Sequence, residues 1–279
     1  MKPIRRLAFV VNADKADAPD LAHELIALAE LSGAKVKQTS RFPVPRGYLK
    51  GWDACCVIGG DGTLLGVAPE AARLGVPLIG VNRGGLGFLT TLSADEARVH
   101  LPEILSGLYQ VEERATLDCS FQKGEKRIAL NDVLIKDAVN SRLIKLDLFA
   151  DRELVSGYTC DGLVFSTPTG STAYNLSAGG PLIHPSAAVI SMTPICPHTL
   201  SNRAIIFRDD VHLRVFNRSD GAKLLVSVDG QPSEKIAGDS PVLISRSKLA
   251  VPLVQRLGHS HFAVVRAKLR WSGGFAEKK

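Results

Sequence analysis

The chain has 279 residues, of which 45% are hydrophobic and 22% are charged, so it is long and apolar enough for two globular domains. The formal net charge is +6, but the positive charges are scattered, so we interpret most of them as a solvated face and exclude nucleic acid as a partner. No window approaches the ~18 apolar residues of a membrane span. The N-terminal segment also lacks the apolar core of a signal peptide, so we expect a cytoplasmic protein with no membrane partner.

Cysteine usage favours the same compartment. The five cysteines are odd in number, lie mostly in apolar runs and show no CxxC spacing. We therefore expect reduced core thiols, not a disulfide framework or a cysteine metal site.

The first third of the chain alternates between strand-like and helix-like patterns. Expected strands are residues 7–11, a strand from 36, 54–58 and 77–81, and expected helices are 19–33 and a stretch ending at 74. This βαβ order predicts an α/β domain with a parallel sheet over residues 1–113. We expect the tail, residues 251–279, to return to that domain.

The pattern changes after about Glu113. Short apolar runs separated by turn residues follow at 128–135, 143–149, 163–165, 204–207, 212–216, 224–228 and 242–244. They predict a mostly antiparallel, β-rich domain over residues 114–250. The amphipathic stretch at residues 100–108 is expected to carry the chain between the two domains.

A glycine-rich turn, GGDGT, follows a strand-like run. Asp61 lies between Gly60 and Gly62, with Gly59 before them and Thr63 after them. Glycines let a ligand approach the backbone, and N–H groups at a helix start favour an anion. The carboxylate would repel phosphate unless it deprotonates an attacking hydroxyl or helps to bind magnesium. The alternative is an Asp-Gly surface turn without a ligand.

A second glycine cluster lies in VNRGGLGFLT, at residues 81–90, and also follows an expected strand. Since ligands of open α/β sheets bind beyond the carboxyl ends of the strands, two such turns predict a cleft. Phe88 would stack there on a flat ring or, alternatively, anchor the loop to the core. The spacing of Gly60, Gly62 and Gly66 fails the GxGxxG fingerprint by one residue, which disfavours a Rossmann dehydrogenase.

The most unusual segment is CDGLVFSTPTGSTAYNLSAGGP, at residues 160–181. Its polar side chains offer donors and acceptors to sugar hydroxyls and phosphates. They are Ser166, Thr167, Thr169, Ser171, Thr172, Tyr174, Asn175 and Ser177. The alternative is a hydroxyl-rich surface loop that satisfies its own backbone.

Asn131 and Asp132 place an amide beside a carboxylate within an apolar run. Because neighbours in a strand face opposite sides, both can reach one ligand only at a bend or a strand end. Otherwise they are a polar pair in solvent. We interpret DGQ, at residues 229–231, as a hairpin turn.

Together these motifs resemble those of bacterial NAD kinases. The resemblance rests on GGDGT at 59–63, NRGGLGFL at 82–89, the asparagine-acid pair at 131–132, DGLVFSTPTGSTAYNLSAGGP from Asp161, CPHTLSNR at 196–203 and DGQ at 229–231. The long hydroxyl-rich motif is specific, whereas phosphofructokinases and diacylglycerol-type lipid kinases carry turns similar to GGDGT.

The resemblance implies an α/β domain followed by a β-sandwich-like domain, with the site between them and at subunit contacts of a homo-oligomer, a dimer or tetramer. It implies a magnesium-dependent kinase that transfers the terminal phosphoryl group of ATP to the 2′-hydroxyl of the adenosine ribose of NAD, giving NADP. ATP is the default donor, and inorganic polyphosphate is a second candidate. The metal ligands stay unassigned.

The same resemblance implies roles for individual residues. Asp61 is the catalytic base, Asn131 and Asp132 bind the ribose, and Asp161 contacts the nicotinamide side or a neighbouring subunit's ligand. The other implied binding residues are Gly59, Gly60, Gly62 and Thr63 for the donor; Thr172, Ala173 and Tyr174 for adenine and ribose, with Asn175, Leu176 and Ser177 nearby; and Phe88, Arg142, Thr159, Thr169 and Gln231.

Two departures from the family pattern bear on specificity. Asp132 stands where the family usually has glutamate, and Thr159 and Cys160 stand where a basic residue or a glycine often precedes the aspartate. The preference between NAD and NADH therefore stays open.

Two other classes of function compete with this one. A lipid or sugar kinase would share GGDGT but would not need the hydroxyl-rich segment, and a lipid kinase should show an amphipathic membrane-binding face, which we do not find. A non-enzymatic nucleotide-binding regulator would keep both glycine turns but would have no use for a base at Asp61.

We predict that Asp61→Asn lowers turnover by ~10²–10⁴-fold, because an amide cannot accept the proton of the attacking hydroxyl. Folding and NAD binding should stay largely intact. Steady-state NADP formation, thermal melting and NAD titration measure the three properties. Near-normal turnover in the variant would remove Asp61 from the mechanism.

Overall fold

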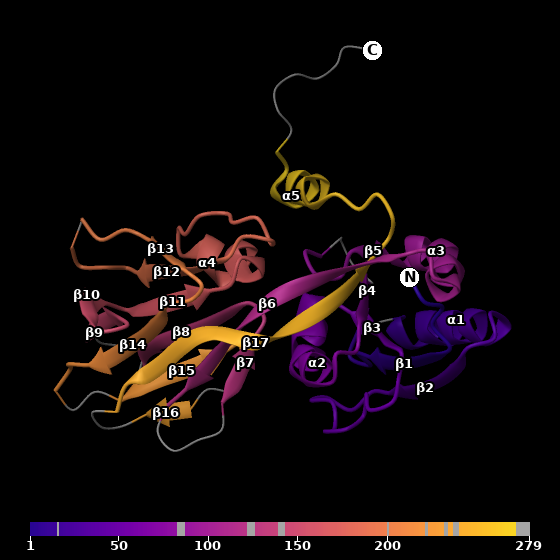
Figure 1. The fold of residues 1–279 in the computed structure, drawn as a ribbon, viewed down its shortest axis with the longest axis horizontal. Helices are drawn as coiled ribbons and strands as arrows, with labels where there is room; N and C mark the ends of the chain where they lie inside the picture. Colours follow the sequence, from indigo (N-terminus) through magenta and orange to yellow (C-terminus); the bar gives the residue numbers. More distant parts are fainter. Residues whose placement is uncertain are drawn as a thin grey trace, which may run out of the picture. The chain divides into compact units, whose positions relative to one another are not determined.

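The computed structural model describes residues 1–15, 17–82, 87–121, 126–138, 143–199, 201–220, 223–231, 234–236 and 240–271 (Figure 1). The chain divides into two compact units. Residues 1–113 and the chain from Val251 on form the first unit, and Arg114–Ala250 form the second. The predicted fold class is confirmed, because the N-terminal part has a parallel sheet with helices and the C-terminal part has antiparallel sheets.

The first unit is built on parallel strands. They are β1 (Arg6–Val11), β2 (Lys35–Thr39), β3 (Ala54–Gly59), β4 (Leu78–Asn82), the short β5 (Leu92–Ser93) and the end of β17 (Val242–Gln255). The order is β17-β4-β3-β1-β2, and β5 pairs with β4. Strands β3 and β4 are buried along their whole length, as expected for a parallel sheet with both faces covered.

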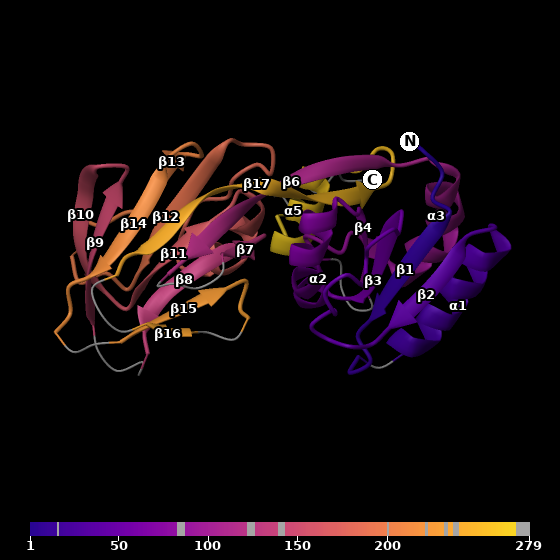
Figure 2. The ribbon, with the colours of Figure 1, turned by 60° about the horizontal axis from the view of Figure 1, so that its bottom comes forward.

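Helices cover both faces of this sheet (Figure 2). Helices α1 (Ala18–Leu31) and α3 (Ala94–Ser106) share one core with Leu7 and Phe9 of β1. Helix α2 (Asp61–Leu74) packs against β3 and β4 and contributes no residue to that core, so it lies on the other face. It contains Pro69 in its interior. Because β3 ends at Gly59 and α2 begins at Asp61, the first turn of the helix lies directly at the carboxyl end of β3.

The crossing between the units differs from the sequence interpretation. Residues 100–108 were expected to carry the chain across, but most of them belong to α3, which a capping box of Ser93 and Glu96 starts earlier in the chain. The crossing element is β6 (Gln110–Ser120). The helix ends where Gly107 takes a left-handed conformation, with φ of 103°.

The second unit contains two antiparallel sheets. The first has the order β13-β12-β11-β8-β15-β16, formed by β8 (Asp132–Asp137), β11 (Gly162–Ser166), β12 (Val189–Ile195), β13 (Ile205–Arg208), β15 (Leu224–Val228) and β16 (Glu234–Ile236). The second joins β9 (Ile144–Ala150), β10 (Glu153–Cys160), β14 (His212–Asn217) and the start of β17, while β6 pairs with β17 and with β7 (Arg127–Ala129).

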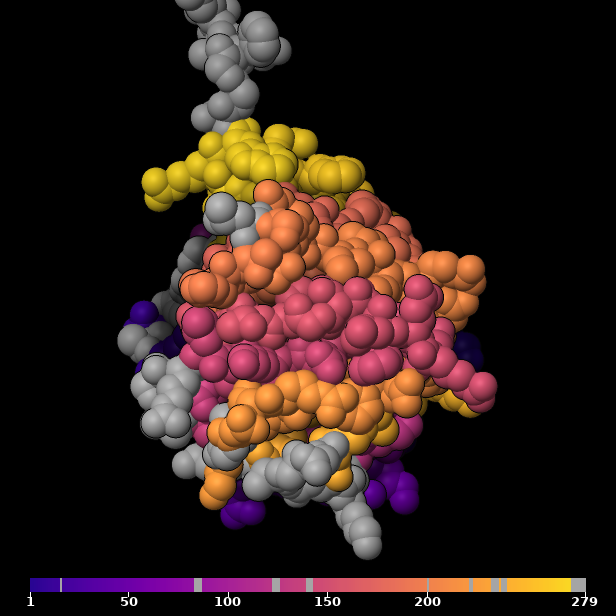
Figure 3. Space-filling view, turned by 90° about the vertical axis from the view of Figure 1, so that its left-hand side faces the viewer, coloured from indigo at the N-terminus to yellow at the C-terminus, as the bar shows by residue number. Residues whose placement is uncertain are grey.

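One apolar core joins these two sheets, with Phe165 from β11 and Leu146 from β9 among its members. The β9–β10 hairpin forms a continuous band across the face of the unit seen in Figure 3. Strands β6, β10, β12 and β16 have no counterpart in the sequence pattern. The expected run at 128–135 is broken into β7 and β8 at Leu130 and Asn131.

Among the described residues, no helix is long and apolar enough to cross a membrane. All five cysteines are free. Four are buried, but Cys196 is exposed, which differs from the expectation of core thiols. The final described helix is α5 (His261–Leu269), whose N-cap Ser260 accepts a hydrogen bond from the amide of Ala263.

Candidate functional site

Three polar segments meet at the carboxyl edge of the parallel sheet. Strands β1, β3 and β4 end in register, with Val11 opposite Ile58 and Gly59 opposite Asn82. Asn12 follows β1 and donates its backbone N–H to the carbonyl of Ile58. The parallel order therefore brings GGDGT between two asparagines, and α2 starts there with its N–H groups directed outward.

The carboxylate of Asp61 is held by backbone N–H groups from the segment after the second glycine cluster. Its Oδ1 accepts from the amide of Leu89 at 3.2 Å and from the amide and hydroxyl of Thr90 at 2.9 and 2.8 Å. Its Oδ2 accepts from the amide of Phe88 at 2.9 Å. The carboxylate is half-buried, so these donors fix a base that keeps access to solvent.

Two glycines permit this close arrangement. A Cβ on Gly87 would lie 2.1 Å from Oδ1 of Asp61. A Cβ on Gly59 would lie 2.5 Å from the hydroxyl oxygen of Thr63. Any larger side chain at either position would displace Asp61 or Thr63. The glycines of both motifs therefore act sterically.

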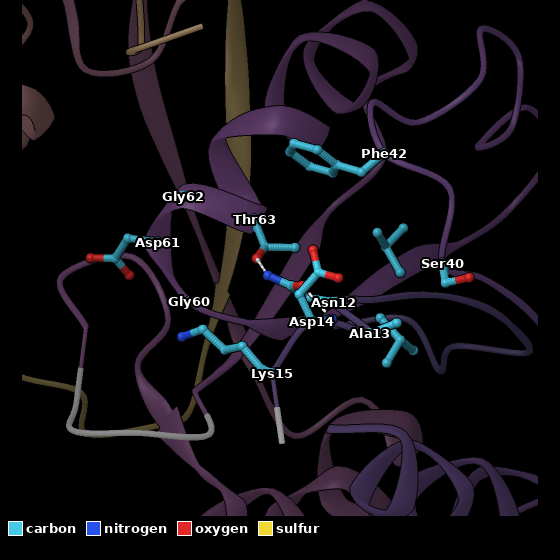
Figure 4. Close-up of a pocket in the computed structure, with 12 residues that line it drawn as sticks. Asn12, Ala13, Asp14, Lys15, Ser40, Phe42, Gly60, Asp61, Gly62 and Thr63 are labelled. Carbon is cyan, nitrogen blue, oxygen red and sulfur yellow. Dashed lines mark hydrogen bonds between the residues drawn. The ribbon is translucent and has the colours of Figure 1, made fainter. Parts of the chain in front are cut away.

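A pocket of about 450 Å³ opens beside this turn (Figure 4). Its lining includes Lys15, Phe42 and Thr63. The Lys15 ammonium lies 3.4 Å from the carbonyl oxygen of Gly59. The pocket thus combines a helix N-terminus with a cation, an arrangement that suits an anion.

The other polar groups of the pocket are connected to each other. The Asn12 side-chain amide donates to the Thr63 hydroxyl at 3.1 Å, and its oxygen accepts from the amide of Asp14 at 3.1 Å. The carboxylate of Asp61 points away from Asn12 and Thr63 (Figure 4). The first turn of α2 therefore contributes residues 60–63 to the pocket lining, while the Asp61 carboxylate is directed away from Asn12 and Thr63.

In the second unit, the break between β7 and β8 is the bend that Asn131 and Asp132 require if both are to face one ligand. The carboxylate of Asp229 holds this bend. It accepts from the amides of Leu130, Asn131 and Asp132 at 2.7, 2.7 and 3.1 Å. The DGQ turn does lie between β15 and β16, but its aspartate also fixes a second turn far away in the sequence.

The carbonyl side of the same bend is held by the hydroxyl-rich segment. The Thr167 hydroxyl donates to the carbonyl of Leu130 at 2.6 Å, and the Thr167 amide donates to that of Asn131 at 2.9 Å. A Cβ on Gly170 would lie 2.0 Å from the Asn131 carbonyl oxygen. The backbone amides and the backbone carbonyls of the bend are therefore all hydrogen-bonded, which holds the bend in one conformation.

Two carboxyl groups meet at this bend. Burial raises the pKa of Asp229 to about 6, against the opposing effect of its three amide donors. Burial, and then repulsion from Asp229, raises the pKa of Asp132 to about 7, although the amide of Tyr174 opposes the shift. The proposed ribose-binding carboxyl therefore changes charge near neutral pH.

The hydroxyl-rich segment divides into internal and outward-facing residues. It forms a 3₁₀ turn (Thr169–Thr172) and the short helix α4 (Tyr174–Ser177). Ser166, Thr167, Ser171 and Thr172 donate to backbone carbonyls, so the self-satisfying alternative holds for these hydroxyls.

Asn175 is also internal. Its amide donates to the carbonyls of Ser171 and Pro181, and its oxygen accepts from Ser191 and Thr193. All four hydrogen-bonding positions of this side chain are used, so we expect it to support the segment and not to contact a ligand.

Five predicted residues of the segment have exposed or half-buried side chains. Tyr174 and Ser177 are exposed, and Thr172, Ala173 and Leu176 are half-buried. The Thr169 hydroxyl is buried without a hydrogen-bond partner in the described part of the chain. The exposed and half-buried residues and the Thr169 hydroxyl keep the capacity to contact a ligand.

The remaining predicted residues are Phe88, Thr159, Asp161, Gln231 and Arg142, of which Phe88 also donates its backbone amide to Asp61. Phe88 is half-buried, with its ring centroid 5.8 Å from the Lys268 ammonium of α5. Thr159 is half-buried at the end of β10, and Asp161 is exposed just after it. Gln231 is half-buried, and its carbonyl accepts from the Ser227 hydroxyl. Arg142 lies outside the described residues.

Comparisons with known proteins decide the family. Residues 46–109 match the ATP-NAD kinase N-terminal domain, and residues 130–256 match the ATP-NAD kinase C-terminal domain. The NAD kinase of Moorella thermoacetica is 33% identical over 282 residues, which cover 97% of this chain and 91% of that protein. The chain belongs to the NAD kinase family. The resemblance inferred from the motifs is confirmed.

Other members of the NAD kinase family agree. The NAD kinase of Thiobacillus denitrificans is 42% identical over 227 residues, 78% of this chain and 77% of that protein. The fold resembles the crystal structure of yeast NADH kinase complexed with NADH, with a TM-score of 0.84 at 24% identity over 100% of this chain and 91% of that one. It also resembles an NAD kinase from Archaeoglobus fulgidus in complex with ATP, with a TM-score of 0.77 at 24% identity over 94% and 99% of the two chains.

Sequence reasoning missed several residues of this NAD kinase family member that the structure places at the two clusters. Asn12 and Lys15 follow β1, and the rule that ligands bind beyond strand ends would have indicated them. Thr90 is the last residue of the VNRGGLGFLT segment, but the motif suggested no role for it. Asp229 was quoted in the DGQ motif but interpreted only as part of a turn.

We predict that Asp132→Asn makes this protein more stable, relative to the wild type, as pH rises. The folded protein holds the protons of Asp132 and Asp229 more tightly than the unfolded chain, where an aspartate pKa is about 3.9. Their contribution to stability is therefore present below about pH 4 and is lost as pH rises through the raised folded-state pKa values.

Thermal unfolding of both proteins between about pH 4 and about pH 8 measures this difference. The exposed Asp220→Asn is the matched control and should track the wild type at every pH. A melting-temperature difference between Asp132→Asn and wild type that does not change with pH would contradict the prediction.

Proposed function

We propose that this protein phosphorylates the 2′-hydroxyl of the adenosine ribose of NAD, with ATP as donor, and so produces NADP. The observation that carries the proposal is the Asp61 carboxylate, held by four hydrogen bonds at the start of α2 beside an anion-suited pocket. Membership of the NAD kinase family supports the choice of substrate.

The acceptor hydroxyl needs a base. A ribose hydroxyl is a poor nucleophile at neutral pH, and a positioned carboxylate that accepts its proton typically contributes ~10²–10⁴-fold. Asp61 is half-buried and rigidly held, so it loses little freedom when the substrate arrives. The resemblance and this geometry support its proposed role as the catalytic base.

The phosphate donor is assigned to the pocket. The α2 N-terminus and the Lys15 ammonium supply positive potential there, and Gly59, Gly60, Gly62 and Thr63 shape the turn. A Cβ on Gly60 would lie 2.9 Å from the Lys15 nitrogen, so glycine leaves room for that cation. The exposed face of Phe42 offers an apolar wall for a purine, which favours ATP over polyphosphate.

Magnesium fits this pocket as a companion of the donor. The described residues contain no group of three or more His, Cys, Asp or Glu side chains that could hold a metal. Mg²⁺ is usually bound by one or two carboxylates together with substrate phosphates, and it would neutralise charge on the transferred group. Asp14 lines the pocket and is the residue that we propose to hold it.

The dinucleotide is assigned to residues of the second unit. Asn131 and Asp132 bind the ribose, and Thr172, Ala173 and Tyr174 bind adenine, all on the strength of the resemblance. The rigid bend held by Asp229 and the exposed Tyr174 ring support these roles. We further propose a cytoplasmic homo-oligomer, whose subunit number sedimentation equilibrium would measure.

The purified protein should form NADP from NAD and ATP, and formation should cease when EDTA removes Mg²⁺. NADP is measured with a coupled NADP-specific dehydrogenase. A parallel reaction with NADH tests the preference for the acceptor, and one with polyphosphate tests the preference for the donor. A reaction with diacylglycerol tests the alternative that the protein is a lipid kinase. An absence of NADP with every donor, despite a folded protein, would overturn the proposal.

We predict that Lys15→Met raises the KM for ATP by roughly tenfold, because the variant loses a charge-assisted contact with the donor phosphates. The KM for NAD should change little, since Lys15 lines the pocket assigned to the donor. The exposed Lys50→Met is the control for a general loss of positive charge. Equal KM values for ATP in all three proteins would remove Lys15 from the donor site.

A further inference from the structure

The two oxygens of the Asp61 carboxylate are not equivalent. Oδ1 accepts three hydrogen bonds, from the Leu89 amide, the Thr90 amide and the Thr90 hydroxyl. From the described part of the chain, Oδ2 accepts one, from the Phe88 amide. Since a carboxylate offers about two lone-pair positions on each oxygen, the described donors saturate Oδ1 and leave one position on Oδ2 open.

Thr90 is responsible for part of this difference between the two oxygens, because its hydroxyl donates to Oδ1. Its side chain is fully buried, and its hydroxyl oxygen accepts from the side-chain amide of Asn82 at 2.9 Å. A threonine hydroxyl carries a single hydrogen, so that hydrogen must point to Oδ1 of Asp61, 2.8 Å away. The direction of the bond is set by Asn82 at the end of β4, a rigid element of the sheet.

We propose that Oδ2 of Asp61 is the atom that accepts the substrate proton, and that Thr90 is a positioning residue that keeps Oδ1 occupied. The inference rests on the proposed function and deepens it. The O–H bond of the ribose hydroxyl breaks and its proton forms a new O–H bond with Oδ2. The ribose oxygen bonds to the terminal phosphorus of ATP, whose bond to the bridging oxygen breaks, and ADP leaves with that electron pair.

The hydrogen-bond pattern favours Oδ2 over Oδ1 for a physical reason. A proton on Oδ1 would displace at least one of three donors and leave a buried group of Thr90 or Leu89 without an acceptor. A proton on Oδ2 occupies the open position and leaves all four existing hydrogen bonds in place. Proton transfer to Oδ2 therefore requires no rearrangement of the segment that holds the base.

Thr90→Val tests the proposal, because valine keeps the shape of threonine and removes only the hydroxyl. We expect kcat for NADP formation to fall by about tenfold, the typical effect of one lost hydrogen bond to a charged group. The KM values for NAD and ATP should stay within about threefold, since Thr90 contacts neither substrate in this proposal. Thr90→Ser keeps the hydroxyl and should restore kcat to near the wild-type value.

The outcomes separate this proposal from the proposed function. If the wild type forms no NADP, the proposed function fails. If the wild type forms NADP and Thr90→Val keeps the wild-type kcat, or if Thr90→Ser is as slow as Thr90→Val, the positioning role of Thr90 is overturned. Equal losses in kcat and in substrate affinity would indicate a merely structural role and would also overturn it.

A second variant carries the test if Thr90→Val does not fold. In Gly87→Ala the new methyl group would lie 2.1 Å from Oδ1 of Asp61 and 2.3 Å from the Thr90 hydroxyl oxygen, so the pair must separate. We expect a fall in kcat of at least tenfold with little change in the KM for ATP. An unchanged kcat in folded Gly87→Ala would show that this contact does not position the base.

Discussion

The contact on which the candidate site depends is the one between the Asp61 carboxylate and the backbone after the second glycine cluster. A carboxylate at a helix N-terminus is favoured by the helix itself, but its direction is set by the donors around it. Here the donors are three consecutive amides, of Phe88, Leu89 and Thr90, joined by a hydroxyl. They belong to the chain that leaves β4, so the parallel pairing of β3 and β4 decides where the base lies.

The second unit uses a similar arrangement for a different purpose. Asp229 also receives three consecutive amides, those of residues 130–132, and it is buried where Asp61 is half-exposed. Burial and three amide donors suit Asp229 to a structural role. In both units a side-chain carboxylate accepts hydrogen bonds from the backbone amides of a turn, which have no neighbouring strand to pair with. These bonds fix the orientation of the residues beside the turn.

Close packing around glycine makes both arrangements possible. The missing Cβ of Gly87 admits the Asp61 carboxylate, and the missing Cβ of Gly170 admits the carbonyl of Asn131. Gly180 similarly leaves room for the Asn175 amide, which fixes the hydroxyl-rich segment through four hydrogen bonds. Many polar side chains of that segment therefore hold the segment itself in place. The exposed Tyr174 belongs to this well-held segment.

The sequence by itself determined the fold class, the family and the strand-end location of GGDGT, because buried parallel strands read as continuous apolar runs and glycine turns are local signals. It also indicated that Asn131 and Asp132 need a bend. Only the tertiary structure decided which groups surround them. The pairing of Asp61 with Thr90 spans 29 residues and that of Asp229 with Asn131 spans 98. Such contacts depend on strand order and register, which no local pattern encodes, and the same is true of Lys15, whose ammonium reaches Gly59 across the edge of the sheet.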